Sequence, residues 1–388
     1  MNPLDAAVWE GLWRRLQDER ASGLASSLGR ALLWPLVPLY QGASLTKRAI
    51  FSCGLFPRTR LPALTVAVGN ITMGGAGKTT ATRLVAGILA DELGIPTAVL
   101  CRGYRSGNRE AVRLVSRPGE APLGADAVGD EAALLARWLP SCPVVLGRRR
   151  AVSGRWAVAE LGVRAVVLDD GFQYWRLERD LDLVSVSAPA GFGNGFLFPR
   201  GPLREPLSFL RRASAILLHQ AGAAEPRSLE TLERSIEEVA PGIPRLRLEP
   251  SPQTLRAAVA GRGEGAPGGW AVPSSLRDEP VFAVCGLGSP ESFFASLEGE
   301  GALVVGRLAV ADHHVYSPGE VIALGRAARA AGARWVVTTE KDEANLTVLP
   351  EEGPPVVVLP VRGTMEPSDR ERLVALLRRA AVASGVLP

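Results

Sequence analysis

Residues 64–80 read Leu-Thr-Val-Ala-Val-Gly-Asn-Ile-Thr-Met-Gly-Gly-Ala-Gly-Lys-Thr-Thr. The first five are apolar or β-branched and predict a short buried strand from Leu64 to Val68. Glycines crowd the middle of the stretch, and apolar residues then recur with helical spacing between residues 84 and 89. The stretch predicts a strand, a glycine-rich loop and a helix, which together form a unit of an α/β fold with a mainly parallel sheet.

The loop in this stretch is of the kind that holds the phosphates of a nucleotide. Its glycines let backbone N–H groups turn inward around phosphate oxygens, and the start of the following helix adds partial positive charge. Lys78 is placed to reach the β- and γ-phosphates, and Thr79 to offer its hydroxyl to Mg²⁺. Thr72 stands where the first glycine of the usual pattern is expected, and a chance glycine-rich turn is the alternative. The expected nucleotide-binding residues of the loop are Thr72, Met73, Gly74, Gly75, Ala76, Gly77, Lys78, Thr79 and Thr80.

Lysine is scarce in this chain. Among 44 basic residues only Lys47, Lys78 and Lys341 are lysines, and the others are arginines. A lysine that persists in such a sequence is expected where a compact ammonium is needed and a guanidinium does not fit. Lys341 follows a predicted strand at residues 334–338, and it either faces the nucleotide or pairs locally with Glu340 or Asp342.

Two acidic pairs are candidates for the chemistry of phosphate transfer. Asp169 and Asp170 follow the apolar strand 165–168 and can hold Mg²⁺ at its carboxyl end, although Asp-Asp-Gly is also a common turn. Asp130 and Glu131 open a predicted helix. Asp130 is either the base that accepts the proton of an attacking hydroxyl or only a helix cap.

Two of the three histidines, His313 and His314, follow Asp312 in a predicted loop. A histidine beside a carboxylate can relay or orient a proton near neutral pH, but an incidental loop histidine fits the pattern equally well. The sequence does not distinguish His313 from His314 as the partner of Asp130. A second long loop, residues 188–206, has aromatic residues suited to acyl or sugar groups and arginines suited to phosphate, with a solvent loop as the alternative.

The segment 1–60 is predicted to be helical and membrane-associated. Charged residues interrupt any apolar run near the start, so no secretory signal is expected. Apolar residues recur every four positions from Leu4 to Leu16, and the stretch 24–43 is broken by charge and two prolines. This pattern favours lying in the membrane interface over spanning it, although the helices could instead only cover the core. Basic residues that would meet anionic headgroups are Lys47, Arg48, Arg58 and Arg60.

Composition bounds the remaining possibilities. The net charge of +4 comes from 44 basic and 40 acidic residues, a balance that speaks against nucleic-acid binding. The four cysteines lack metal-ligand spacing and are expected to be reduced thiols, which suits the cytoplasm. With 388 residues, two domains are expected: a P-loop NTPase-like domain at 61–250 and a second, smaller α/β domain at 251–388, with a Pro- and Gly-rich loop at 261–275.

Taken in order, these motifs resemble those of the tetraacyldisaccharide 4'-kinases, the lipid A 4'-kinases. The resemblance covers nearly the whole chain, and its many ordered motifs are more specific than a lone phosphate loop. Besides that loop it rests on Arg102-Gly103-Tyr104, Gly129-Asp130-Glu131, Asp169 through Gln173, residues 191–195 and 201–206, Asp312-His313-His314 and Thr338 through Asp342.

The resemblance implies an enzyme that uses ATP and Mg²⁺ to phosphorylate the 4'-hydroxyl of a tetraacylated glucosamine disaccharide 1-phosphate, giving lipid IVA in lipid A biosynthesis. It implies a glycolipid substrate, no evident obligate protein partner, and a peripheral or monotopic position on the cytoplasmic face of the bacterial inner membrane. The second domain would close over the cleft. The implied site consists of Asp130, His313 and Lys78 for catalysis, Thr79, Asp169 and Asp170 for the metal, Arg204 and Glu205 near the nucleotide, and Arg102, Tyr104, Gln173 and Asn194 at the substrate.

Two positions depart from the family pattern and bear on substrate detail. Tyr174 stands where the family usually has histidine, and Arg105 stands where glycine is common. Two other functions stay open on the sequence alone. One is a P-loop ATPase or GTPase that regulates a partner protein, and the other is a soluble small-molecule kinase.

Overall fold

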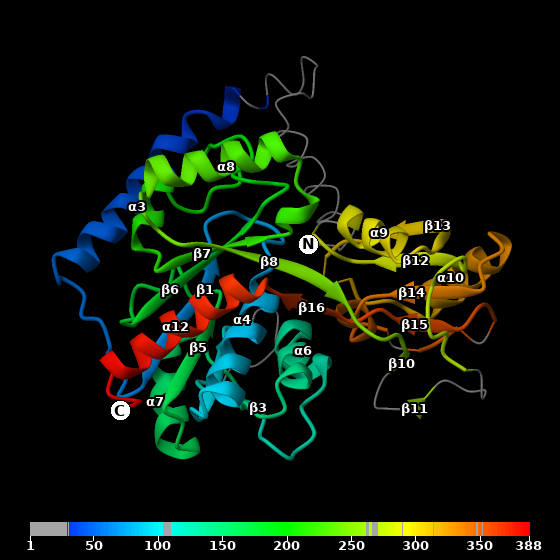
Figure 1. The fold of residues 1–388 in the computed structure, drawn as a ribbon, viewed down its shortest axis with the longest axis horizontal. Coiled ribbons are helices and arrows are strands. Elements are labelled where there is room, and N and C mark those ends of the chain that lie inside the picture. The colour runs from blue at the N-terminus through cyan, green and yellow to red at the C-terminus, as the bar shows by residue number, and fades with distance from the viewer. Residues whose placement is uncertain are drawn as a thin grey trace. The chain divides into compact units, whose positions relative to one another are not determined.

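The computed structural model describes residue 29 and residues 31–103, 110–260, 264–265, 271–288, 290–312, 314–346, 348–350 and 352–388. The chain divides into two compact units (Figure 1). Unit 1 comprises the chain up to residue 102, residues 147–249 and residues 365–388. Unit 2 comprises residues 103–146 and 250–364. The expected domains were 61–250 and 251–388. The division differs from them because residues 103–146 belong to unit 2 and residues 365–388 belong to unit 1.

The centre of unit 1 is a parallel sheet. Six strands neighbour one another in the order β8, β7, β6, β1, β5, β2, and their pairings are parallel. Every residue of β1 is buried, as expected for a central strand covered on both faces. Their bounds are β1 (Leu64–Asn70), β2 (Thr97–Cys101), β5 (Ala165–Asp169), β6 (Leu181–Ser187), β7 (Ala215–His219) and β8 (Arg245–Pro252).

The order of these strands determines where a ligand can bind. Strands β5 and β2 lie on one side of β1, and β6, β7 and β8 lie on the other. In sheets of this type the crevice at such a change of direction, outside the carboxyl ends of the strands, is the usual ligand site. The helical segments of unit 1 are α3 (Leu36–Ser52), α4 (Lys78–Gly87) with its π-helical continuation η1 (Ile88–Glu92), α7 (Arg150–Leu161), η2 (Leu207–Arg212), η3 (Ala221–Ala223), α8 (Pro226–Val239) and α12 (Pro367–Ala383).

Helix α12 belongs to unit 1 although it follows unit 2 in sequence. Asp369 accepts a hydrogen bond at 2.8 Å from the backbone N–H of Arg247, and Arg370 forms an ion pair with Glu92. The helix was expected in the second domain because its amphipathic pattern shows that one face is buried, not which unit buries it.

Unit 2 contains a second sheet with the strand order β13, β12, β14, β15, β9. Residues 103–146 belong to this unit, where α6 packs against α11. The strands expected at 281–286, 303–310 and 334–338 form as β12, β13 and β14. The elements of unit 2 are β3 (Arg113–Ser116), α5 (Ala125–Val128), α6 (Asp130–Trp138), β4 (Val144–Leu146), β9 (Arg256–Ala257), β10 (Val259–Ala260), β11 (Glu264–Gly265), β12 (Pro280–Cys285), α9 (Pro290–Gly299), β13 (Leu303–Ala309), α10 (Pro318–Ala330), β14 (Trp335–Thr338), α11 (Glu340–Glu343), β15 (Val356–Val358) and β16 (Val361–Thr364).

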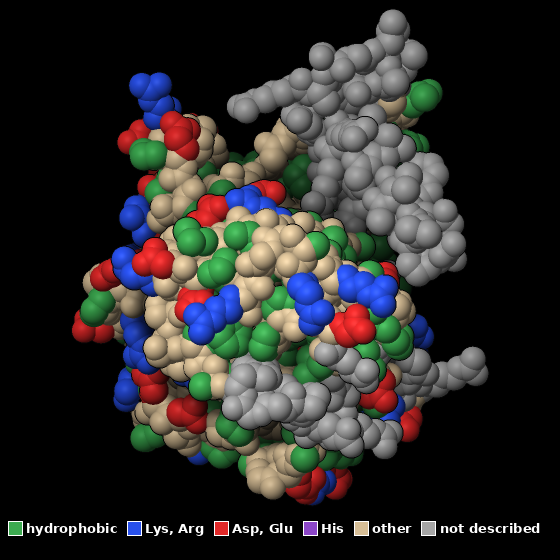
Figure 2. Space-filling model, turned by 90° about the vertical axis from the view of Figure 1, so that its right-hand side faces the viewer, with side chains coloured by type: hydrophobic (Ala, Val, Ile, Leu, Met, Phe, Trp, Pro, Cys, Tyr) green, Lys and Arg blue, Asp and Glu red, His purple; other side chains and the backbone are tan. Residues whose placement is uncertain are grey.

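Surface features bear on the expected membrane segment. Within the described ranges, no helix has both the length and the apolarity to cross a bilayer. Helix α3 starts after Pro35 and leaves Leu36, Leu39 and Leu45 exposed. On the face drawn in Figure 2, acidic and basic side chains are interspersed with apolar ones. The cysteines form no disulfide bonds: all four are free thiols, of which Cys53 is exposed and Cys101, Cys142 and Cys285 are buried.

Candidate active site

The phosphate loop connects the carboxyl end of β1 to the first residue of α4. Gly77 precedes the helix with φ +72°, and Gly74 has φ +99°, both left-handed conformations that glycine adopts without strain. Thr72 differs, because its backbone forms an antiparallel bridge with Leu203. Extended backbone needs no glycine, so this departure from the usual pattern leaves the loop intact. Residues 73–75 of the loop are exposed.

Gly77 also lies against His219, the last residue of β7. A Cβ atom on Gly77 would lie 2.4 Å from Cδ2 of the His219 ring. The ring atom Nδ1 is buried without a hydrogen-bond partner in the described part of the chain. Burial lowers the pKa of His219 to about 4, so the ring is neutral at pH 7 and acts as a packing support under the loop.

The turn after β5 brings two aspartates to this loop. It approaches β1 closely at two glycines: a Cβ on Gly69 of β1 would lie 2.6 Å from Cβ of Phe172, and one on Gly171 of the turn would lie 2.9 Å from Cβ of Ala67 in β1. The N–H of Gly171 donates to the carbonyl oxygen of Val68 at 2.8 Å. Close backbone contact thus fixes the turn beside the phosphate loop.

Asp170 is the acidic residue that meets the loop lysine. Its Oδ1 lies 4.0 Å from Nζ of Lys78 and 2.7 Å from Nη1 of Arg204. Burial alone would raise the pKa of Asp170, but Lys78 and Arg204, with a smaller effect of Arg150, lower it below its ordinary value. The carboxylate is therefore ionised and held between cations, in a backbone conformation of φ +53° that is uncommon outside glycine.

The oxygen atoms near Lys78 fit a magnesium ion. Asp169 ends β5 and accepts a hydrogen bond at 3.0 Å from Oγ1 of Thr82 in α4, while Thr79 lies in the first turn of the same helix. Mg²⁺ prefers hard oxygen ligands and usually takes one or two carboxylates together with phosphate oxygens and water. The carboxylates of Asp169 and Asp170 and the hydroxyl of Thr79 are donors of this kind, so the residue types predicted for the metal are compatible with Mg²⁺. No cluster of three or more metal-ligating His, Cys, Asp or Glu side chains occurs within the described residues.

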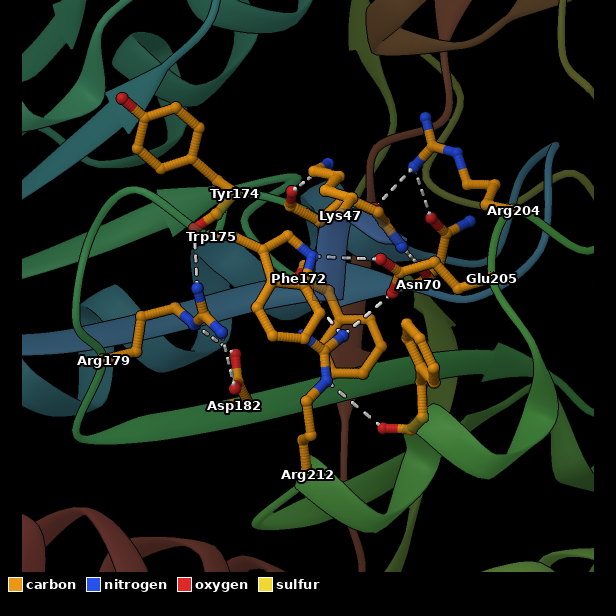
Figure 3. A network of polar contacts seen from close by, with 12 residues as sticks. Lys47, Asn70, Phe172, Tyr174, Trp175, Arg179, Asp182, Arg204, Glu205 and Arg212 are labelled. Atoms are coloured by element: carbon orange, nitrogen blue, oxygen red, sulfur yellow. Dashed lines mark hydrogen bonds and ion pairs between the residues drawn. The ribbon is translucent and has the colours of Figure 1, made fainter. Parts of the chain in front are cut away.

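Arg204, the ion-pair partner of Asp170, also contacts Asn70 at the end of β1, as Figure 3 shows. Its Nη1 donates to Oδ1 of Asn70 at 2.9 Å and to Oε1 of Gln173 at 3.3 Å. Nε2 of Gln173 donates in turn to the carbonyl oxygen of Asn70 at 2.7 Å. The N–H of Arg204 donates to the carbonyl oxygen of Ile71 at 2.8 Å. The structure thus gathers Lys78, Asp170, Gln173 and Arg204 in one cluster.

Glu205 points into the protein rather than toward the phosphate loop. Its carboxylate accepts hydrogen bonds from Nε1 of Trp175 at 3.2 Å and from Nη2 of Arg212 at 2.9 Å (Figure 3). The guanidinium of Arg212 lies 4.1 Å from the ring centre of Phe172 and 4.0 Å from that of Trp175. Burial raises the pKa of Glu205 and lowers that of Arg212 to about 10, so the two charges depend on each other.

Helix α3 contacts the same cluster through two polar side chains. Oη of Tyr40 donates to the carbonyl oxygen of Arg204 at 3.0 Å, and Nζ of Lys47 donates to that of Gln173 at 3.2 Å. Val37 of this helix is buried in the core of unit 1. The helix therefore covers part of the core and also supports the site.

Basic residues that the sequence assigned to headgroups have contacts within the protein. Lys47 holds Gln173, as described above. The guanidinium groups of Arg48 and Arg58 lie over the rings of Phe209 and Trp175, at 4.8 and 5.7 Å from the ring centres. Arg60 forms exposed ion pairs with two acidic residues, Glu178 and Asp180.

The residues that the family resemblance assigned to substrate binding do not all belong to the cluster around Arg204. Arg102 is exposed directly after β2, and Tyr104 lies outside the described residues. Nδ2 of Asn194 donates to the carbonyl oxygen of Arg200 at 3.1 Å, so this side chain braces its own loop. The loop 188–206 is a series of hydrogen-bonded turns whose Leu197 and Leu203 join the core.

In unit 2, the electrostatic surroundings of Lys341 include Asp130. Lys341 forms an ion pair with Asp312, rather than the local pair with Glu340 or Asp342 that the sequence allowed. Burial alone would lower the pKa of Lys341, but Asp312 and, more weakly, Asp130 raise it. This unit therefore brings together Asp130 of α6, Lys341 of α11 and Asp312 of the histidine loop.

The contacts of Asp130 and His314 bear on two alternatives that the sequence left open: the role of Asp130 and the choice between His313 and His314 as its partner. Oδ1 of Asp130 accepts a hydrogen bond at 2.9 Å from the N–H of Glu131, so the residue also has a role at the start of α6. Nε2 of His314 lies 3.1 Å from Oε1 of Glu320, a residue of the capping box of α10. His313 lies outside the described residues, and its role stays a prediction.

Several residues that contact the site were not predicted from the sequence. Arg150 and Arg212 are two of the many arginines of the chain, and no motif singled them out. Arg150 is buried and donates to the carbonyl oxygen of Asp169 at 2.8 Å. His219 could have been noticed as the third histidine of the chain. Its contact with Gly77 is long-range and was not predictable from spacing.

The chain is similar to known proteins over most of its length. The family model described as tetraacyldisaccharide-1-P 4'-kinase matches residues 29–380. The tetraacyldisaccharide 4'-kinase of Anaeromyxobacter dehalogenans (strain 2CP-C) is 42% identical over 337 residues, covering 87% of this chain and 85% of that protein. The one of Syntrophus aciditrophicus (strain SB) is 35% identical over 360 residues, covering 91% and 94%.

The fold of the chain is also similar to that of a solved structure. LpxK from Aquifex aeolicus, described as an "apo" form in complex with ATP, matches with a TM-score of 0.66 and 27% identity, and the match covers 90% of this chain and 99% of that one. With its phosphate loop, its paired aspartates and its two α/β units, the chain belongs to the tetraacyldisaccharide 4'-kinase family, as its sequence motifs led us to expect.

Proposed function

We propose that this protein transfers the γ-phosphate of ATP to the 4'-hydroxyl of a tetraacyldisaccharide 1-phosphate, giving lipid IVA. The observation that carries the proposal is the cluster of Lys78, Asp170 and Arg204 at the carboxyl end of β1, in a chain of this family. Two cations beside a carboxylate provide the charge that a transferred phosphoryl group and its metal ion need.

The nucleotide would occupy the exposed part of the phosphate loop. Backbone N–H groups of residues 73–79 would hold the phosphates, and Lys78 and Arg204 would neutralise charge on the transferred group. Mg²⁺ bound by Asp169, Asp170 and Thr79 would supply further positive charge at the phosphate oxygens. Without nucleotide, Lys78 and Arg204 neutralise Asp170 instead, so we expect nucleotide binding to be coupled to metal binding at that carboxylate.

Asp130 is the proposed general base. Its carboxylate would accept the proton of the 4'-hydroxyl while that oxygen attacks the γ-phosphorus and ADP leaves. The ion pair of Lys341 with Asp312 would keep the charges around Asp130 fixed. Because His314 is engaged with Glu320, His313 is the histidine we propose as the partner of Asp130.

We also propose that the N-terminal segment attaches the protein to the cytoplasmic face of the bacterial inner membrane. A row of exposed apolar residues, Leu32, Trp34, Leu36 and Leu39, supports this location. A glycolipid substrate with four acyl chains would itself lie in that membrane. Because α3 packs on the core, the informative truncation removes residues 1–28 and leaves α3 in place. That truncation should weaken binding to anionic vesicles and preserve ATP binding.

The test is transfer of labelled phosphate from ATP to the tetraacyldisaccharide 1-phosphate in detergent micelles. Lys78→Ala should abolish both ATP binding and transfer, whereas Asp130→Asn should abolish transfer and preserve ATP binding. Glu178→Gln, which changes an exposed ion pair, is the control that should transfer normally. ATP hydrolysis that is indifferent to the lipid, with no labelled lipid formed by the native protein, would exclude this function.

A further inference from the structure

We propose that Asp342 is a positioning residue for proton transfer, which fixes Lys341 and the described residues of the histidine loop, 311–312 and 314–316. The proposal rests on the function proposed above, in which Asp130 is the base. The juxtaposition that carries it is one buried carboxylate that binds the turn after β12, the start of α11 and the end of the histidine loop. Asp342 is 2% exposed, so it acts through these neighbours and not on a substrate.

Helix α11 depends on Asp342 for its position. The helix has four residues, Glu340–Glu343, and so short a helix has little stability of its own. Oδ2 of Asp342 accepts a hydrogen bond from Oγ1 of Thr339 at 2.6 Å, and the N–H of Asp342 donates to the same hydroxyl oxygen at 3.1 Å. This reciprocal cap fixes the turn from which Lys341 reaches Asp312.

The other oxygen of Asp342 binds the turn after β12. Oδ1 accepts a hydrogen bond from the N–H of Gly286 at 2.7 Å. A Cβ on Gly286 would lie 2.8 Å from that oxygen and 2.9 Å from the carbonyl oxygen of Ala311, the residue before Asp312. Gly286 therefore allows the carboxylate and the histidine loop to approach the same turn.

Tyr316 connects Asp342 to the far end of the histidine loop. Its Oη donates to Oδ1 of Asp342 at 3.5 Å, and its N–H donates to the carbonyl oxygen of Asn345 at 3.1 Å. The ring of His314 lies edge-on to the ring of Tyr316, with the centroids 5.0 Å apart. The loop is thus held at residues on both sides of His313 in the sequence.

The carboxylate of Asp342 is costly to bury, and its contacts show what it contributes. Burial raises the pKa of Asp342, and hydrogen bonds from Thr339 and Gly286 offset part of that effect. An apolar side chain could fill the same space without the cost of desolvating a charge. A carboxylate has two acceptor oxygens, and here they bind three donors from separate segments of unit 2. This arrangement favours a role in positioning over a role in stability alone.

The position of Lys341 matters because of the charges that face it. These are Asp312 of the histidine loop, Asp130 and Glu131 of α6, and Asp342 itself. A nearby cation favours the ionised form of a carboxylate, which is the form that a base requires. Displacement of Lys341 should therefore move the fall of kcat at low pH to a higher pH.

The test replaces the carboxylate by its neutral isostere. Asp342→Asn should lower kcat about tenfold or more, as a loss of positioning would, and move the fall of kcat at low pH upward by about half a unit or more. KM for ATP should stay within about twofold of the native value, because the phosphate loop belongs to unit 1. Tyr316→Phe keeps the ring and removes only Oη, and should lower kcat about threefold.

Glu279→Gln is the matched control. Glu279 is a partly buried carboxylate that accepts a hydrogen bond from Nε1 of Trp335 at 3.1 Å. It precedes β12, whereas Asp342 follows β14, so the two carboxylates lie at opposite ends of these parallel strands. Glu279→Gln should therefore keep the native kcat and the native pH profile.

Hydrogen exchange measures the positioning without any reaction. In Asp342→Asn, amide exchange at residues 314–316 and 340–343 should be about tenfold faster or more, because the contacts that hold these segments are weakened. Exchange at the phosphate loop should be unchanged. Glu279→Gln should show native exchange at 314–316 and 340–343.

The outcomes separate the proposal from its alternatives. An equal loss of kcat in Asp342→Asn and Glu279→Gln, with no change in the pH profile, would mean that Asp342 only stabilises unit 2 and would overturn the proposal. Native exchange at 314–316 in Asp342→Asn would also overturn it. Should Asp342→Asn not fold, native kcat and native exchange in Tyr316→Phe would have the same meaning. Faster exchange in a protein whose native form phosphorylates no lipid would support the positioning contacts and reject the proposed function, so the two failures are distinguishable.

Discussion

At the scale of single residues, the site depends on close contacts that only certain side chains allow. Gly77 combines a left-handed backbone with a ring of His219 at the place where a Cβ would be. Glu205 and Arg212 are buried charges that each need the other. For each of these two contacts we predict the effect of one substitution and compare it with a control substitution elsewhere in the chain.

Gly77→Ala should abolish ATP binding, because the new Cβ would clash with His219 and strain the backbone at φ +72°. Gly94→Ala is the control, since Gly94 has φ +63° with nothing within 4 Å of its Cβ position. The measurement is the Kd for ATP by calorimetry. Combining Gly77→Ala with His219→Ala should restore part of the binding, and normal affinity of Gly77→Ala alone would contradict the geometry.

Glu205→Gln should lower the free energy of unfolding by about 3 kcal/mol, because it leaves the buried guanidinium of Arg212 without a counter-charge. Glu178→Gln removes an exposed ion pair with Arg60 and should cost less than about 1 kcal/mol. Urea unfolding of both variants measures the difference. Equal stability of the two would show that the buried pair contributes no more than a surface pair.

At the scale of elements, α3 is joined to the loops of the site. The helix is anchored by Val37 in the core, and its Tyr40 and Lys47 hold backbone oxygens of Arg204 and Gln173. A segment that is expected to contact the membrane is thereby connected to the cluster that we propose acts on phosphate.

Tyr40→Phe removes one hydrogen bond from α3 to the backbone of Arg204 and keeps the ring. We expect kcat to fall about three- to tenfold, as a loss of about 1 kcal/mol in positioning would produce, with little change in KM for either substrate. Steady-state kinetics of the purified variant provide the check. An unchanged kcat would mean that the helix only covers the core.

At the scale of the whole molecule, the candidate residues are divided between two units. The phosphate loop, Asp169, Asp170 and Arg204 belong to unit 1, whereas Asp130, Asp312 and Lys341 belong to unit 2. Nucleotide binding and proton transfer are therefore expected to be separable by mutation, as the proposed comparison of Lys78→Ala with Asp130→Asn tests.

The stability of the protein should fall in mild acid through His219. Its pKa is about 4 in the folded protein against 6.5 for the free side chain, so between these values only the unfolded chain takes up the proton. Acidification from pH 6.5 to 4 should therefore lower the free energy of unfolding by up to about 3 kcal/mol from this group. His219→Gln should show a correspondingly smaller loss in urea unfolding at pH 7 and pH 4.5, and an identical loss would contradict the assignment.

The sequence by itself determined the phosphate loop, the strand before it, the helix after it and the family, because these depend on local patterns: glycine spacing, apolar runs and short ordered motifs. It also indicated Lys78, Asp170, Gln173 and Arg204, which the fold brings together. Tertiary structure alone decided the placement of α12 in unit 1 and of residues 103–146 in unit 2. It alone decided the inward orientation of Glu205, the contact of His219 with Gly77 and the hydrogen bond of Asp342 with Gly286. Each of these depends on contacts between residues far apart in the chain, and an amphipathic pattern or a residue type shows that a side chain is buried without showing against what.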